Sequence, residues 1–324
     1  MSVIQYMIFA AILVYYHKRP ETELDNSVRQ DYYLRNRQWR NIINDFSGKK
    51  YNVQTINVLC LALAEEGELN TRLFSYHPYG TQPVLGKWDS TLPMAMALSD
   101  IYYEIGDLAS AQKFAFEGYV SSTLYGYGNV RSLMRLVQTN LILSNYAVAR
   151  KYLSILENTL FYKKWAKSNM KYLNDESLMA DPILSFKRKA FDKSFELPLD
   201  GNALETFERL AVNNPSCALP MQYCLALSLT NKDIKHFKYL IDTYYNTPVL
   251  PSLPDCVQQA VIALDQNNPD YWRHHGVSLG IEQQFYGFNQ DVIDKHNYMD
   301  FADLMAKDYG NTYWYYLMFV KLEK

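Results

Sequence analysis

The sequence lacks two features that would assign it to a common functional class: paired cysteines and an excess of charge. The four cysteines are scattered without a CxxC pair, and a chain of 324 residues needs no disulfide framework to stabilise its core. We interpret them as small buried apolar residues. The formal net charge is only -2, so the chain lacks the basic surface needed to neutralise nucleic-acid phosphates. Nucleic acid is therefore not an expected partner.

Metal-binding and nucleotide-binding patterns are also missing. The histidines form no HExxH pattern and no mixed Cys/His spacing, so we predict no metal site and no cofactor. Segment 80–87 (GTQPVLGK) resembles a phosphate loop. However, it has one intervening residue too many, and Trp88 follows where a hydroxyl side chain should ligate magnesium. We interpret this resemblance as a coincidence.

One segment matches the nucleophile elbow of serine hydrolases only formally. Residues 276–280 read GVSLG, which would make Ser278 the nucleophile, with Asp291, Asp294 and His296 following in the right order. That chemistry requires a strained turn between a strand and a helix at the top of a sheet. No stretch of the chain shows sustained strand-type alternation with hairpin turns. A serine hydrolase remains a remote alternative, and we predict no catalytic residue.

No confident membrane span is present either. The N-terminal apolar run, residues 3–16 (VIQYMIFAAILVYY), would extend roughly 21 Å as a helix, against about 30 Å of hydrocarbon. It fits a cleaved signal peptide poorly, because a basic start and a cleavage site are missing. A marginal anchor, the last helix of a longer membrane region and a buried first helix all remain open. We expect membrane association, at a bacterial inner membrane. Lys18 and Arg19 favour a cytoplasmic soluble part, and a periplasmic one stays open.

Apolar and aromatic residues are abundant. They make up 48% and 15% of the chain, which includes 28 tyrosines. This composition supports a sizeable core. Tyrosine has an apolar ring and a polar tip, so it suits the half-buried ridges between helices and also suits the binding of sugars or peptides. We assign most of the tyrosines to packing.

A repeated helix–turn–helix pattern recurs about every 38 residues, slightly more than the tetratricopeptide period of about 34. Its clearest copy, residues 96–114, has an aromatic residue before a glycine turn and small residues along the second helix. Small residues at this spacing let a neighbouring helix approach closely. The residues assigned to repeat turns and packing are Gly67, Tyr102, Gly106, Ala111 and Ala149.

The pattern predicts an all-α chain folded as a right-handed α-α superhelix of tetratricopeptide-like helix pairs. Lys187, Arg188 and Lys189 lie in a charged segment that we interpret as a solvated linker between two halves. The predicted parts are an N-terminal apolar helix (1–18), a first set of repeats (19–173), the linker (174–200), and further repeats with an aromatic C-terminal capping helix (201–324).

Several blocks of the sequence carry a family resemblance. They are RNRQWRNII (35–43), NVLCLALAEEGELNTRLFSY (57–76), IYYEIGDLASAQKFAFEG (101–118), LVQTNLILSNYAVARKYLSILENTLFYKKWA (136–166) and YGNTYWYYLMF (309–319). In general they look like the tetratricopeptide superfamily. More specifically, they resemble an uncharacterised family of membrane-associated proteins from Bacteroidota. The longer members of that family have several transmembrane helices, most of which this sequence lacks. The resemblance implies a helical-repeat fold and membrane association, and no activity.

The leading functional hypothesis is a non-enzymatic scaffold for protein–protein interaction, because stacked helix pairs form a curved surface that suits a peptide or a protein. Its partner is a protein or peptide whose identity the sequence leaves open, as it does the oligomeric state. The alternative is a helical-repeat protein that binds a glycan or a small ligand. Candidate partner-binding residues lie in the Pro/Gly-rich loop 77–90 and in a Trp-Arg-His segment: His77, Tyr79, Trp88, Trp272, Arg273 and His274.

Overall fold

The computed structural model describes residue 7 and residues 23–46, 52–76, 78–121, 129–190 and 203–322. These ranges form α-helices and two short 3-10 helices. They contain no β-strand, only isolated bridges around Leu250. The predicted all-α class is confirmed. None of the described helices is both long and apolar enough to cross a membrane. Apart from Met7, the apolar run 3–16 lies outside the described residues.

The helices fall into three consecutive groups. The first contains α2 (Glu23–Arg35), α3 (Trp39–Asp45), α4 (Val53–Glu65), α5 (Leu69–Arg72) and the 3-10 helix η1 (Leu73–Tyr76). The second contains α6 (Leu92–Ile105), α7 (Leu108–Ser121), α8 (Val130–Ile142), α9 (Tyr146–Glu157), α10 (Lys163–Asn169), the 3-10 helix η3 (Met170–Tyr172), α11 (Asp175–Met179) and α12 (Pro182–Ala190). The third contains α13 (Ala203–Asn213), α14 (Leu219–Thr230), α15 (Ile234–Tyr244), α16 (Asp255–Leu264), α17 (Pro269–His274), α18 (Leu279–Lys295), α19 (Phe301–Tyr309) and α20 (Tyr313–Phe319).

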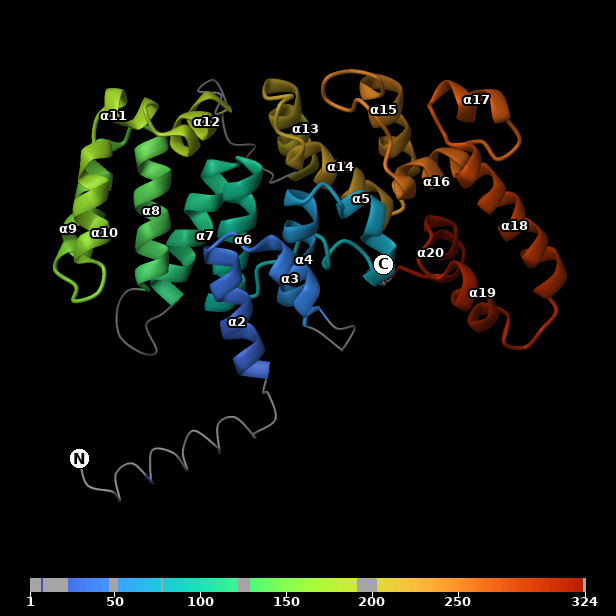
Figure 1. The fold of residues 1–324 in the computed structure, drawn as a ribbon, viewed down its shortest axis with the longest axis horizontal. Helices are drawn as coiled ribbons and strands as arrows, with labels where there is room; N and C mark the ends of the chain where they lie inside the picture. Colours follow the sequence, from blue (N-terminus) through green and yellow to red (C-terminus); the bar gives the residue numbers. More distant parts are fainter. Residues whose placement is uncertain are drawn as a thin grey trace.

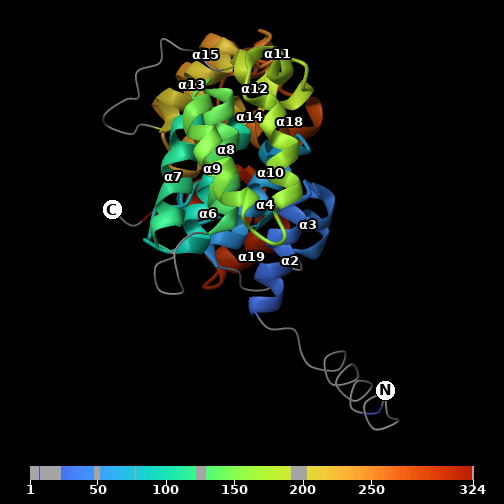
Figure 2. The ribbon, with the colours of Figure 1, turned by 90° about the vertical axis from the view of Figure 1, so that its left-hand side faces the viewer.

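The order of these groups in space differs from their order in the chain. The first group occupies the middle of the molecule, the second extends to one side of it, and the third starts beside the first and extends to the other side (Figures 1 and 2). Helix α14 packs against α4, α5 and α6, and α16 packs against α5. The array is therefore built outwards in both directions from its first helices.

The hydrophobic core follows this arrangement. Its larger cluster unites residues of the first group with residues of the third, for example Leu59 and Phe74 with Phe207 and Trp314. A smaller cluster fills the second group, from Tyr103 to Leu184. The first and third groups therefore share one core, although the predicted linker separates them in the chain.

The segment expected to be a solvated linker is partly helical and packed. Residues 175–190 contain α11 and α12, and the side chain of Lys187 is only 8% exposed. The expectation is corrected here: Lys187 is buried because a carboxylate of α6 pairs with it. The rest of the expected linker, 191–200, lies outside the described residues.

The predicted repeat turns share one geometry. At the ends of several helices a residue adopts the left-handed conformation, and the next amide donates to a carbonyl five residues back, as Glu68 N does to Leu63 O at 2.7 Å. This bond satisfies a carbonyl that the helix end leaves unpaired. The left-handed residues at these ends are Arg37, Gly67, Ser144, Lys232 and Gly276. Gly106, also left-handed, caps α6.

Small residues allow the helices of the second group to approach closely. Ala111 and Ala149 are fully buried. A Cβ added to Gly118 would lie 2.8 Å from Met96 Cε on α6 and 3.0 Å from Ser132 Oγ on α8. Tyr102 stacks on Phe114, with 5.5 Å between ring centroids. The structure thus places the predicted packing residues at helix contacts.

Candidate functional site

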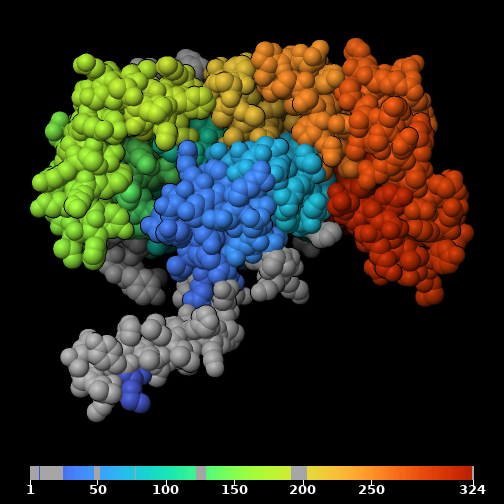
Figure 3. Space-filling model, in the orientation of Figure 1, coloured from blue at the N-terminus to red at the C-terminus, as the bar shows by residue number. Residues whose placement is uncertain are grey.

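A cleft opens between α2–α3 on one side and the start of α10 with α12 on the other, with α6 and α8 at its base. In Figure 3 it is the hollow between the blue and the yellow-green surfaces. Two cavities of about 230 Å³ and about 350 Å³ form it, and both are lined by Arg37, Glu104 and Ile183. The shared lining makes the two cavities parts of one cleft.

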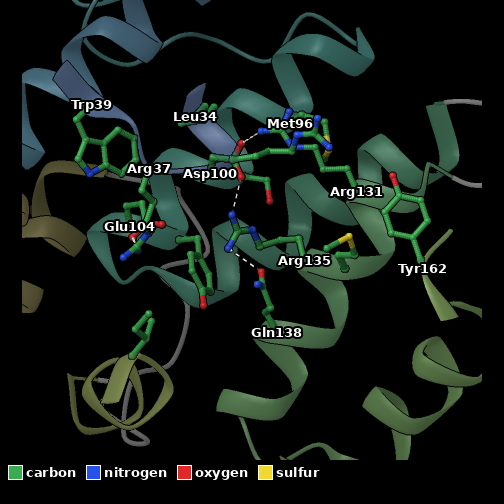
Figure 4. Close-up of a pocket in the computed structure, with 15 residues that line it drawn as sticks. Leu34, Arg37, Trp39, Met96, Asp100, Glu104, Arg131, Arg135, Gln138 and Tyr162 are labelled. Atoms are coloured by element: carbon green, nitrogen blue, oxygen red, sulfur yellow. Dashed lines mark hydrogen bonds and ion pairs between the residues drawn. The ribbon is translucent and has the colours of Figure 1, made fainter. Parts of the chain in front are cut away.

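Charged residues at helical spacing reach the first cavity from α6 and α8. Asp100 and Glu104 lie four residues apart on α6, and Arg131 and Arg135 lie four residues apart on α8, so each pair shares one face of its helix. Arg37 reaches the cavity from the turn after α2, where it adopts the left-handed conformation. Figure 4 shows these side chains converging.

Asp100 is the centre of the first ion-pair cluster. Its carboxylate accepts hydrogen bonds from Arg131 and from Arg135, the latter at 2.5 Å. Arg131 also pairs with Asp31 of α2, and the Arg135 guanidinium lies 3.6 Å from the centroid of the Tyr103 ring. Burial raises the pKa of Asp100, although Arg135 opposes the rise. The cluster ties α2, α6 and α8 together.

Glu104 is the centre of the second cluster. Its carboxylate pairs with Arg37 and, at 3.0 Å, with Lys187 Nζ of α12. Lys187 also donates to the backbone carbonyl of Tyr103 at 2.8 Å. Burial opposes ionisation of Glu104, but Lys187 and Arg37 outweigh it and hold its pKa at about 2. Glu104 is therefore ionised at neutral pH and fastens α12 to α6.

Glu65 differs from the other charged residues of the cleft. It is the last residue of α4 and lines the second cavity beside Arg37, Glu104 and Lys187. Among the described residues, its carboxylate has no ion-pair partner and no side-chain hydrogen bond. Burial, and secondly repulsion by Glu104, raise its pKa to about 7. The cleft thus contains one carboxyl group that titrates near neutral pH.

Comparison with protein-family models assigns the chain to a family. Residues 2–320 match a model described as a family of unknown function (DUF6057). The chain belongs to this family. No curated protein and no solved structure matches the chain at a significant level. All the cleft residues of this DUF6057 member lie within the matched range.

The predicted loop residues of this DUF6057 member lie away from the cleft. His77 is outside the described residues. Tyr79 is 52% exposed, whereas Trp88 packs edge-on against Phe114 with 6.0 Å between ring centroids. Neither Tyr79 nor Trp88 lines either cavity. Helix α4 contacts the loop segment 80–87, because Asn57 Nδ2 donates to the backbone carbonyls of Gln82 and Pro83.

Trp272 is a core residue, which corrects its assignment to partner binding. Its side chain is 1% exposed, its Nε1 donates to Asp265 O at 2.7 Å, and its ring packs edge-on against Phe285. A large aromatic side chain on a short helix contributes most by burial. Arg273 and His274, which follow it, are exposed, and Arg273 pairs with Asp270 at 3.4 Å.

The residues of the hydrolase-like motif lie along a single helix. Ser278 is the N-cap of α18, and His296 is its C-cap. At about 1.5 Å per residue, the two are separated by roughly 27 Å. Gly276 forms the left-handed turn between α17 and α18. The serine and the histidine are therefore not brought together, and segment 276–280 is a turn between two helices.

The sequence analysis missed the residues of the cleft. Asp100 and Glu104 occur in a helix that is otherwise largely apolar, and their spacing matches that of Arg131 and Arg135. Charged residues at i and i+4 within apolar helices are a signal for a buried ion-pair cluster. The sequence does not reveal which helices face one another, so it could not pair these groups.

The titration of Glu65 predicts a pH-dependent effect of Glu65→Gln. The pKa of Glu65 is higher in the folded chain than its ordinary value of 4.5, so the folded state loses stability as the pH rises from 4.5 to about 7. Because the side chain is partly exposed, solvent screens part of this cost. We expect Glu65→Gln to raise the free energy of unfolding by about 1–2 kcal/mol above pH 7, and by almost nothing near pH 4.5.

Urea denaturation of both proteins at the two pH values measures this effect. The neighbouring Glu66→Gln is the matched control, because Glu66 is already paired with Arg40 at 2.6 Å. An equal gain from Glu65→Gln at both pH values would contradict the raised pKa.

Proposed function

We propose that this chain is a non-enzymatic interaction protein that holds an extended segment of a partner protein in the cleft between α2–α3 and the α10–α12 side. The observation that carries the proposal is the continuity of the cleft, since its two cavities, of about 230 Å³ and about 350 Å³, share the lining residues Arg37, Glu104 and Ile183. Concave sites with a few convergent polar groups are the usual places of ligand binding.

The side chains of the cleft suit a polypeptide. Ile183 and Phe186 of α12 line it and are 51% and 43% exposed, so they leave apolar surface available at its edge. The charged clusters of Asp100 and Glu104 lie deeper. Apolar contact at the edge supplies affinity, and fixed charges at the base favour one sequence over another.

The proposal includes the finer architecture and the membrane association. The recurrent left-handed turns and the side-by-side packing of α6, α7, α8 and α9 support an α-α superhelix of tetratricopeptide-like pairs. The apolar run 3–16 supports attachment to a membrane, proposed here as a bacterial inner membrane, with the positive charges after it favouring a cytoplasmic helical part.

Phe186→Asp tests the proposal. A carboxylate at the cleft edge would have to be desolvated by an apolar partner surface, so we expect recovery of the co-purifying partner to fall by about tenfold or more. The measurement is quantitative mass spectrometry after affinity purification from membranes of the native host. Circular dichroism of the purified variant shows that it remains folded.

Phe116→Asp is the matched control. Phe116 lies on α7, is 52% exposed and lines neither cavity. The control should retain all proteins recovered with the unaltered chain. If Phe186→Asp retains the same proteins at the same level, the cleft is not the binding surface.

A further inference from the structure

The charges of the cleft are almost completely paired within the chain. The lining cations and carboxylates form ion pairs that join Arg35 to Asp31, Arg37 to Glu104, Arg131 to Asp31 and Asp100, Arg135 to Asp100, and Lys187 to Glu104. Among the described residues that line the two cavities, Glu65 is the charged side chain without such a partner. The cations are therefore already engaged, and the group available to a ligand is a carboxylate.

The surroundings of Glu65 favour a positive group. The charged and titratable side chains that interact with it are Glu104, Arg37, Lys187, Glu66, the hydroxyl of Tyr223 and the thiol of Cys217. Repulsion by Glu104 is the largest of the electrostatic effects on Glu65, ahead of the attraction by Arg37 and by Lys187. A further cation placed beside Glu65 would relieve both this repulsion and the loss of hydration.

The walls of the second cavity suit a long side chain that carries its charge at the tip. Ile183, Phe186 and Leu219 line it, and its volume is about 350 Å³. Lysine and arginine side chains bury their methylene stems against such apolar surface while the charged end meets a polar partner. The cavity thus offers apolar contact for the stem and a carboxylate for the tip.

We propose that the cavity beside Glu65 binds a basic side chain, with an ammonium or guanidinium group paired to the Glu65 carboxylate. This inference rests on the proposed function, because the basic side chain belongs to the partner segment held in the cleft. Binding requires the ionised form of Glu65, so affinity rises as the pH passes through about 7. The partner is thereby defined as a segment with a lysine or an arginine at this position.

The test uses agmatine, which carries the guanidinium group and stem of an arginine side chain, with the purified full chain. We expect saturating agmatine to lower the pKa of Glu65, followed through its ¹³C carboxyl resonance, by about one unit or more. The affinity for agmatine should rise about tenfold from about pH 6 to about pH 8, because the ionised fraction of Glu65 rises by that factor.

Glu65→Gln keeps the shape of the side chain and removes its charge, and it should weaken agmatine binding at least about tenfold. Glu66→Gln, one residue away and paired with Arg40 in the unaltered chain, should bind as before. An unchanged Glu65 resonance, or equal binding by Glu65→Gln, would overturn the inference. Agmatine binding is independent of the partner protein, so this failure is distinguishable from the loss of the pull-down effect of Phe186→Asp.

Discussion

Glu104→Gln is expected to lower the free energy of unfolding at pH 7 by about 3–5 kcal/mol, the range typical of breaking a buried ion pair from one side. The side chains of Glu104 and Lys187 are each only 8% exposed and lie 3.0 Å apart. Glutamine leaves Lys187 buried without a counter-charge. Urea denaturation followed by circular dichroism measures the loss.

The effect of Glu104→Gln should depend on pH with a defined sign. The pKa of Glu104 is lowered from 4.5 to about 2, so its ionic contribution is complete above 4.5 and is lost as the pH falls towards 2. The difference from the unaltered chain should shrink over that window. Adding Lys187→Met should recover part of the stability, because it removes the buried ammonium group that Glu104→Gln leaves without a counter-charge. A single variant as stable as the unaltered chain would show that the pair does not hold α12 in place.

Phe74→Ala is expected to destabilise the chain by a similar amount, about 3–5 kcal/mol. Phe74 of η1 is 1% exposed, and its ring lies 5.5 Å from that of Tyr313 and 4.9 Å from that of Tyr316, both of α20. Alanine leaves a cavity at the junction between the first and the third helix groups. Thermal and urea denaturation measure the change.

Two further measurements decide whether this junction belongs to one shared core. Because the first and third groups share a cluster, the tryptophan fluorescence, with Trp39 in the first group and Trp272 and Trp314 in the third, should change together with the helical signal in a single transition. The matched control, Phe116→Ala, removes an exposed ring and should alter stability by no more than about 0.5 kcal/mol. Equal stability of the Phe74→Ala and Phe116→Ala variants would contradict the shared core.

The helical class and several turns followed from short-range information. Apolar residues at helical spacing indicated the helices, and the predicted turns at Gly67 and Gly106 have the left-handed conformation in the structure. The aromatic C-terminal segment forms α20 with Tyr313 and Trp314 buried. These features depend on residues within about one or two helical turns, so a sequence pattern can carry them.

The placement of the functional candidates depends on contacts between distant parts of the chain. Lys187 reads as a solvated charge in the sequence, yet it is buried because Glu104, far away in the chain, supplies the opposite charge. Trp272 reads as a surface aromatic but fills the core. Glu65 became a candidate because α4, α6, α12 and the turn before α14 meet around it. Helical periodicity predicts which face of a helix is apolar, but not which helix will cover it. Only the packed helices therefore determine which charged side chains pair with one another and which carboxylate has no ion-pair partner among the described residues.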